Sequence, residues 1–170
     1  MHPVNLAQMP PFYHKYIEKV DAATLPEAFE KYKSQLLPFV SAIPEEKWEW
    51  RYAPGKWTIK ESVQHMIDTE RIFAYRALAF ARRDPNPLPG FDENAYTPAS
   101  RANRRSSASL VAELELVHQS TVALFESFDA EMLAASGVAN GNSVYVEGIG
   151  FIIVGHGLHH LALFKERYLV

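Results

Sequence analysis

Hydrophobic residues recur every three or four positions along three long stretches of this chain, which is the spacing of one face of a helix. The first stretch follows Thr24 and carries Leu25, Phe29, Tyr32, Leu36 and Phe39 or Val40. The second follows Thr58 and carries Ile59, Val63, Met66, Ile67, Ile72, Phe73, Leu78 and Phe80. The third begins at Ser106 or Ser107 and carries Leu110, Leu114, Val117, Thr121, Leu124, Phe125 and Phe128. We therefore predict three amphipathic helices.

The first two predicted helices begin with capping-box patterns. Thr24 is followed three positions later by Glu27, and Thr58 is followed by Glu61. In each pair the hydroxyl can cap the first turn while the glutamate reaches back to the start of the helix. Pro38 predicts a kink near the end of the first helix.

A fourth helix is predicted from about Glu147 to Val170. Its apolar run, from Gly148 to Phe164, is shorter than the roughly 20 apolar residues of a membrane span. The run also contains three histidines and four glycines. It therefore suits a buried helix of a bundle better than a membrane helix.

The segments outside these helices differ in kind. Residues 1–23 begin irregularly and contain a short amphipathic piece, Phe12–Val20, which we expect to pack on the main body as an arm. The segment from Asp84 to about Ser107 is rich in Pro, Asn, Ser and Arg, and is either a solvated connector or a lid over a site. Residues 129–147 form a second break, in which Ser143–Val146 could be a short extended turn.

These elements predict one all-α domain spanning residues 1–170. Four helices with two long connections indicate a four-helix bundle, and the connection between the second and third helices can be a crossover. A chain of 170 residues, 48% of them hydrophobic, can bury one sizeable core. Functional sites in such bundles are built from inward-facing side chains of different helices.

The composition excludes several classes of partner. The formal net charge is -3, and the basic residues are scattered apart from a cluster at residues 101–105, so we expect no nucleic-acid partner. The N-terminus has no charged region followed by an apolar one, so we expect a cytoplasmic protein. There is no cysteine, so any thiol chemistry needs a thiol from outside the chain.

The fourth predicted helix contains two histidines that could hold a metal ion. His156 and His160 are one turn apart and project from the same face. His65, about two turns into the second predicted helix, could supply a third nitrogen. Three neutral imidazoles leave coordination positions open, which is typical of a catalytic metal rather than a structural one. Imidazole alone does not choose among zinc, nickel, iron and manganese.

Two alternatives stay open for this cluster. The histidines could be core residues with satisfied hydrogen bonds, and His159 competes with His160 as the partner of His156, unless it lies outside the bundle or supports a ligand. Gly155 and Gly157 flank His156 inside the helix, where each costs about 1 kcal/mol relative to alanine. We therefore expect a neighbouring helix or a ligand to approach closely there.

The remaining histidines lack a second ligand at helical spacing. His2 and His14 lie in the N-terminal arm and are expected at the surface. His118 lies on the third predicted helix without a ligand-type residue one turn away on its face, so we expect a structural role for it.

Four motifs, taken together and in order, resemble the DinB-like superfamily, the YfiT/DinB group of metal-binding four-helix bundles. They are Gly55–Glu61, Gln64–Glu70, Pro89–Asp92 and Gly155–His160. The resemblance covers the chain from about Leu25 to the C-terminus. It implies an up-down-down-up bundle with a long crossover between helices two and three, and a homodimer.

The same resemblance implies a divalent metal ion held by His65, His156 and His160. Characterised members include transferases that use low-molecular-weight thiols such as bacillithiol, and a mycothiol-dependent isomerase, while others are described as metal-dependent hydrolases. We therefore expect a metal-dependent transferase that activates a small thiol for attack on a small-molecule electrophile. The alternatives are a hydrolase that uses metal-activated water, and a metal- or ligand-binding dimer without turnover.

A general base for hydrolysis is not singled out by spacing. His156 is not followed by the glutamate that serves as the base in HExxH proteases, which argues against peptide hydrolysis of that type. Asp68, Asp92 and Glu93 are the candidates for a catalytic carboxylate.

Overall fold

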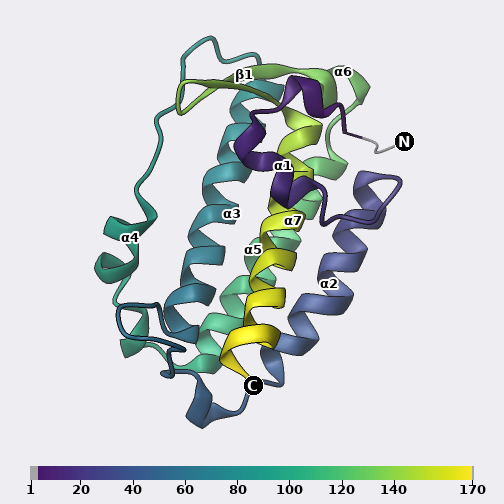
Figure 1. The fold of residues 1–170 in the computed structure, drawn as a ribbon. Coiled ribbons are helices and arrows are strands. Elements are labelled where there is room, and N and C mark those ends of the chain that lie inside the picture. Colours follow the sequence, from purple (N-terminus) through teal and green to yellow (C-terminus); the bar gives the residue numbers. More distant parts are fainter. Residues whose placement is uncertain (1–3, 170) are drawn as a thin grey trace.

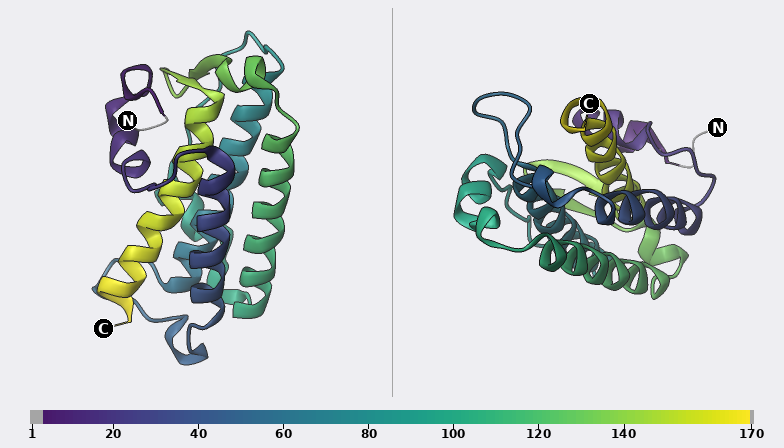
Figure 2. Two further views of the ribbon diagram at one scale, coloured as in Figure 1. Left: turned by 90° about the vertical axis from the view of Figure 1, so that its right-hand side faces the viewer. Right: turned by 90° about the horizontal axis from the view of Figure 1, so that it is seen from below.

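The structure, a computed structural model, describes residues 4–169. Its four long helices are α2 (Leu25–Ser41), α3 (Ile59–Ala81), α5 (Ser107–Glu126) and α7 (Val146–Leu163). They lie side by side as a bundle (Figure 1), and the end-on view in Figure 2 shows the helices around a shared core. The all-α four-helix bundle predicted from the sequence is confirmed.

Helices α3 and α5 run in the same direction. Gln64 accepts a hydrogen bond from Arg105, just before α5 begins, and farther along both helices Glu70 is bonded to His118. Figure 1 shows α2 and α7 running the opposite way. The chain must therefore return along the length of the bundle between α3 and α5, and residues 82–106 make this crossover along its outside.

The crossover contains a helix that the sequence analysis did not predict, α4 (Glu93–Ser100). The Asp92 carboxylate caps it by accepting a hydrogen bond from the backbone N–H of Asn94 at 2.9 Å. Only Thr97 of this helix is buried, and Pro98 lies inside it. Such a short helix gives almost no hydrophobic periodicity, so the sequence pattern did not predict a helix in this segment.

The second break contains a short helix and a two-stranded hairpin. They are α6 (Ala130–Ala134), β1 (Ser136–Ala139) and β2 (Asn142–Tyr145), and the strands pair antiparallel. The expected extended turn at 143–146 is thus mainly a strand. The turn is Asn140-Gly141, where both residues have positive φ, 51° and 73°. Asn-Gly with this geometry is the favoured two-residue hairpin turn, so the signal was present in the sequence.

The N-terminal arm packs on the bundle through α1 (Pro11–Ile17), which lies along α7 (Figure 2). Ile17 is fully buried there. His14, which was expected at the surface, is half-buried, and its Nε2 nitrogen lies 3.0 Å from the carbonyl oxygens of both Leu6 and Met9. His2 lies outside the described residues.

The two predicted N-terminal caps differ in detail. At α3 the capping box is complete, with Thr58 and Glu61 each accepting a hydrogen bond from the other's backbone N–H. At α2 the Thr24 hydroxyl accepts from the N–H of Glu27, but the Glu27 carboxylate reaches the N–H of Ala23 instead. Both helix starts predicted from the sequence are nevertheless correct.

Helix α7 packs against α2, α3 and the α1 helix of the arm and is buried along most of its length. It continues as a π-helix over Phe164–Tyr168, so the whole helical stretch has 23 residues and, by length and composition alone, could cross a membrane. Because 72% of its most apolar window is buried inside the protein, it is the core helix of the bundle. The predicted end at Val170 lies outside the described residues.

Candidate metal site

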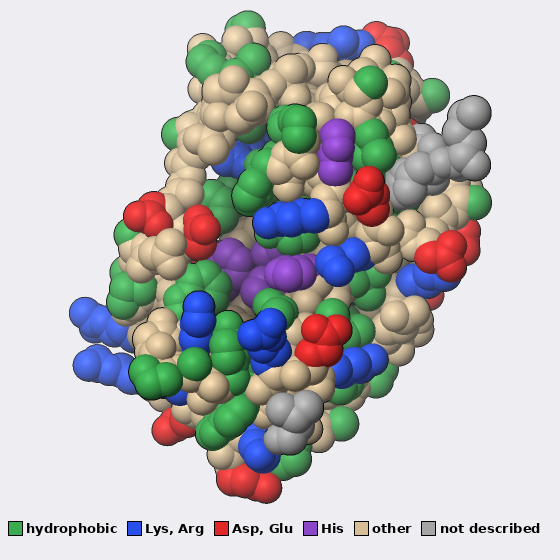
Figure 3. Space-filling model, viewed as in Figure 1, with side chains coloured by type: hydrophobic (Ala, Val, Ile, Leu, Met, Phe, Trp, Pro, Cys, Tyr) green, Lys and Arg blue, Asp and Glu red, His purple; other side chains and the backbone are tan. Residues whose placement is uncertain are grey.

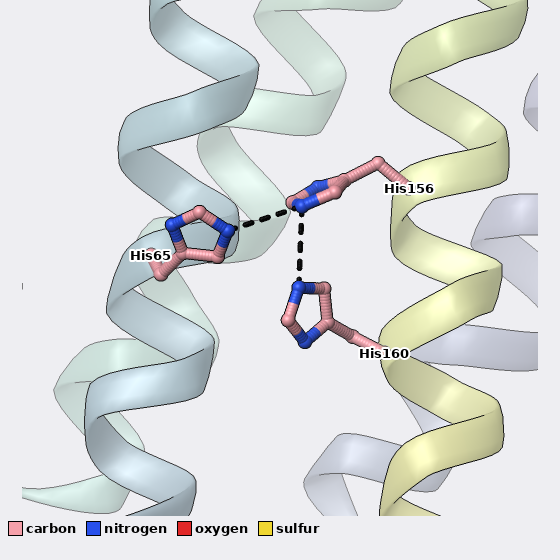
Figure 4. Close-up of side chains that lie close together, drawn as sticks. All are labelled: His65, His156 and His160. Atoms are coloured by element: carbon pink, nitrogen blue, oxygen red, sulfur yellow. Dashed lines mark hydrogen bonds between the residues drawn. The ribbon is translucent and has the colours of Figure 1, made fainter. Parts of the chain in front are cut away.

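Three histidines from two helices meet inside the bundle. His65 projects from α3, and His156 and His160 project from α7 (Figure 4). The Nε2 atom of His156 lies 3.1 Å from Nε2 of His65 and 3.2 Å from Nε2 of His160. The ligand atoms of all three residues lie within 4.8 Å of one another. The structure thus brings together the three residues that the sequence analysis proposed as ligands.

Local packing explains why His156 can sit so deep between helices. A Cβ atom at Gly155 would fall far inside contact distance of the Tyr16 carbonyl oxygen on α1, and one at Gly157 would collide with the ring of Tyr32 on α2. Both glycines therefore permit close approach of a neighbouring element. This confirms the expected reason for two glycines inside a helix.

The three imidazoles are held in the neutral form at neutral pH. Burial lowers the pKa of His65 to about 4, although the charge of Glu93 acts in the opposite direction. Burial also lowers the pKa of His156 and of His160 well below the ordinary value, and the neighbouring histidines add to this. The neutral imidazole is the form that coordinates a metal ion.

The donor set fits a divalent cation. Imidazole nitrogens bind zinc at about 2.0–2.1 Å, so two nitrogens that share one ion can be at most about 4.2 Å apart. The separations of 3.1 Å and 3.2 Å around His156 meet this condition. Among the described residues no carboxylate belongs to the cluster, so three nitrogen atoms would form the protein's share of the coordination.

A cavity of about 190 Å³ opens beside two of these histidines. His65 and His156 line it together with residues of the arm, α3, the crossover and the hairpin turn. Figure 3 shows histidine side chains exposed at the centre of this face, with Lys and Arg side chains around them. The site therefore has a route for a small molecule.

The three candidate carboxylates have different surroundings. Glu93, in the first turn of α4, lines the same cavity as His65. Asp68 lines a separate groove between α3 and α4 and accepts a hydrogen bond from Gln64 at 2.9 Å. Asp92 is engaged as the cap of α4. Of the three, Glu93 is the carboxylate that the fold places at the cavity.

His159 lies beside the cluster without joining it. Its ring is half-buried and contacts the ring of Tyr16, with 5.4 Å between centroids. Burial lowers its pKa, and Lys19 and Lys15 lower it further. Its side chain thus packs under the arm, and the competition between His159 and His160 is resolved in favour of His160 as the neighbour of His156.

A second buried histidine has a carboxyl partner. His118 of α5 donates a hydrogen bond from Nδ1 to Oε1 of Glu70 at 3.0 Å, and the Tyr32 hydroxyl donates to the other oxygen of Glu70 at 3.2 Å. The Tyr32 ring stacks on His118 with 4.0 Å between centroids. No sequence pattern predicts this cluster, because its residues come from three helices and none has a partner at helical spacing.

Comparison with known proteins agrees with this fold. The chain is 28% identical over 138 residues to a protein of Oceanobacillus iheyensis named "Putative metal-dependent hydrolase OB0413", covering 80% of this chain and 79% of that one. The fold matches YfiT from Bacillus subtilis, described as a probable metal-dependent hydrolase with an unusual four-helix bundle topology. That match has a TM-score of 0.70 and 18% identity, and covers 91% of this chain and 84% of that chain. The family model of the DinB superfamily matches residues 28–164. The chain therefore belongs to the DinB superfamily.

Proposed function

We propose that this protein is a metal-dependent hydrolase whose divalent cation is held by His65, His156 and His160. The observation that carries the proposal is the meeting of three neutral imidazoles, with their ligand atoms within 4.8 Å, at the side of an open cavity. Two similar proteins, one named a "putative" and the other a "probable" metal-dependent hydrolase, support hydrolysis over thiol transfer. The identity of the metal is not set by imidazole ligands alone.

A bound divalent cation would supply a Lewis acid that lowers the pKa of water. The chain's own residues then have three tasks. The histidines hold the cation at the cavity wall, the aromatic residues of the arm and crossover limit access of bulk water, and Glu93 accepts a proton at its carboxylate. We assign this last role to Glu93 because Asp68 and Asp92 are engaged elsewhere.

Metal retention is the first test. Purified wild-type protein loaded with zinc, nickel, iron or manganese and then desalted is expected to keep about one ion per chain. His156→Ala should weaken metal affinity at least about 100-fold, because it removes the ligand at the centre of the cluster. His159→Ala is the matched control on the same helix and should keep the metal. Equal retention in both variants, measured by elemental analysis, would overturn the site.

Activity is tested on the metal-loaded protein with a panel of small esters, amides and reactive electrophiles, each with and without a small thiol. Consumption without thiol supports hydrolysis, whereas strictly thiol-dependent consumption supports the transferase expected from the sequence. Glu93→Gln should lower kcat by about 10²–10⁴-fold with unchanged metal content. No turnover of any substrate would leave a binding protein. The homodimer and the cytoplasmic location stay predictions.

A further inference from the structure

Arg76 is a buried cation in the cavity beside the histidines. It lies on α3, three turns beyond His65, and is only 3% exposed. Its side chain lines the same cavity as His65 and His156. Burial of an arginine costs free energy unless its charge is paired, so the groups around Arg76 matter.

The protein gives this guanidinium only neutral partners. Nη2 donates to the carbonyl oxygen of Pro89 at 2.8 Å, and the guanidinium carbon lies 5.0 Å from the centre of the Phe73 ring. The Tyr13 phenol also interacts with it, while burial lowers the pKa of Arg76. Within the described residues no carboxylate oxygen lies within 4.0 Å of it.

Three other arginines of the protein form ion pairs with glutamates. Arg71, one and a half turns earlier on α3, and Arg105 both form ion pairs with Glu113. Arg83 is paired with Glu131. These ion pairs are at least partly exposed to water. Water solvates an exposed guanidinium, so an acidic partner adds little there. The least exposed of these arginines is thus the one without an acidic partner.

The surroundings of the cavity add positive charge. The Lys15 ammonium lies 4.5 Å from the ring centre of Phe12 and 4.8 Å from that of Tyr16, and both rings line the cavity. In Figure 3 basic side chains lie next to the histidines on a protein whose formal net charge is -3. Glu93 is the acidic residue that lines the cavity. Local charge therefore favours an anion over a cation or a neutral molecule.

We propose that the substrate carries a carboxylate and that Arg76 binds it. A guanidinium has five N–H donors in a planar fork that matches the two oxygens of a carboxylate, and the protein's own contacts leave donors free. A cavity of about 190 Å³ suits a small organic acid. Arg76 would then hold one end of the substrate while its reacting group faces the histidines. This inference rests on the proposed function for the reaction, but not for the binding of the acid.

The test is a calorimetric titration of metal-free protein with butyrate, butyramide and inorganic phosphate. Removing the metal prevents the acid from binding to the ion instead of the arginine. Butyrate should bind about tenfold to a hundredfold more tightly than butyramide, because a hydrogen bond to a charged group exceeds one to a neutral group by about that factor. Equal affinities of wild-type protein for the two ligands, or undetectable butyrate binding, would overturn the proposal. Tighter binding of phosphate than of butyrate would overturn the carboxylate assignment.

Variants locate the effect at one residue. Arg76→Met should remove the preference for butyrate over butyramide, and Arg76→Lys should keep part of it. Arg71→Met, which changes an exposed arginine of the same helix, should leave the preference intact. Unchanged butyrate affinity in folded Arg76→Met would contradict the assignment, and the wild-type comparison decides the matter if that variant does not fold.

The two proposals can fail independently. Arg76→Met should retain metal as wild type does, because Arg76 is not one of the proposed ligands. If wild-type protein binds butyrate selectively but never retains metal, the hydrolase proposal fails and the carboxylate site stands. If metal is retained and butyrate is not preferred, the carboxylate site fails and the metal site stands.

Discussion

The bundle buries two histidine clusters that start only five residues apart on α3, and they are built in opposite ways. In one, His118 is bonded to the carboxyl group of Glu70, which also accepts a bond from Tyr32. In the other, Nε2 of His156 faces the Nε2 atoms of His65 and His160, and Nδ1 of His65 lies 3.4 Å from the Thr69 hydroxyl oxygen. In the first cluster the Glu70 carboxylate satisfies Nδ1 of His118 and the Tyr32 hydroxyl, while Nε2 of His118 has no hydrogen-bond partner among the described residues. In the second cluster the Nε2 lone pairs of the three neutral imidazoles point toward one another, and a cation between them would accept all three.

Burial alone therefore does not identify a metal ligand. His118 is as deeply buried as His156 and His160, yet its nearest ionisable partner is an acid. What separates the clusters is the chemistry of the partner: an acidic group makes an internal bond, whereas a set of neutral nitrogens makes a coordination site.

The largest expected effect is on stability at the Glu70 cluster. Glu70→Ala leaves His118 buried without its partner and opens a cavity, so we expect the free energy of unfolding to fall by about 3–5 kcal/mol. Denaturant unfolding of metal-free protein measures this. The matched variant, His65→Ala, removes an imidazole that has no acidic partner and should cost the metal-free protein clearly less. Equal losses in the two variants would remove the distinction between the clusters.

Acidification should act through the nitrogen cluster. The pKa of His65 in the folded protein is about 4, below the ordinary value of 6.5, because the ring is buried. Between these two pH values the unfolded chain binds a proton that the folded chain excludes, so metal-free protein should lose stability as the pH falls from about 6.5 to about 4. Above pH 6.5 this contribution vanishes. The loss of stability from His65 is at most roughly 3.4 kcal/mol.

The pH effect is isolated by difference. Unfolding of wild-type protein and of His65→Ala is followed from pH 7.5 to pH 4 in the presence of a chelator. The variant should show a shallower decline in this window. Parallel curves would mean that His65 is protonated as easily in the folded protein as in the unfolded chain.

The smallest effects are expected at the two glycines beside His156. Gly155→Ala would force α1 away at the Tyr16 backbone, whereas Gly157→Ala would push the Tyr32 ring off His118. Overpacking costs about 1–3 kcal/mol, and about 1 kcal/mol of helix propensity offsets part of it. Gly155→Ala should raise the rate of proteolysis within the arm, and Gly157→Ala should alter the near-ultraviolet dichroism of the tyrosines. If Gly155→Ala altered the tyrosine dichroism and Gly157→Ala raised proteolysis of the arm instead, the packing described would be contradicted.

Much of the fold is readable from the sequence because four helices carry their own periodicity and caps. Thr58 and Glu61 mark the start of α3 without any tertiary information. Helix α4 was missed because it is short and mostly exposed. The hairpin was missed although Asn140-Gly141 is a turn signal, because its strands have only four residues each and show no clear alternation.

The candidate site was only partly accessible to the same reasoning. The spacing of His156 and His160 is a local pattern that a helix turns into geometry, so it could be read directly. The meeting with His65 depends on how α3 packs against α7, so the residue pattern offers His65 only as a possible third nitrogen, and the family resemblance implies it as a ligand. The bond between Glu70 and His118 and the position of Arg76 in the cavity depend on contacts across helices and the crossover. No local periodicity encodes such contacts.

The parallel course of α3 and α5 has a consequence for how this fold can diversify. Because the return between them runs outside the bundle and passes the mouth of the cavity, the exposed residues of 82–106 can be exchanged without repacking the interior, whereas Leu88, Thr97 and Ala102 are buried. Substrate preference is thus expected to evolve mainly in that return segment, while the histidine-bearing helices stay the same. Grafting this segment from one bundle to another should transfer selectivity more readily than exchanging whole helices.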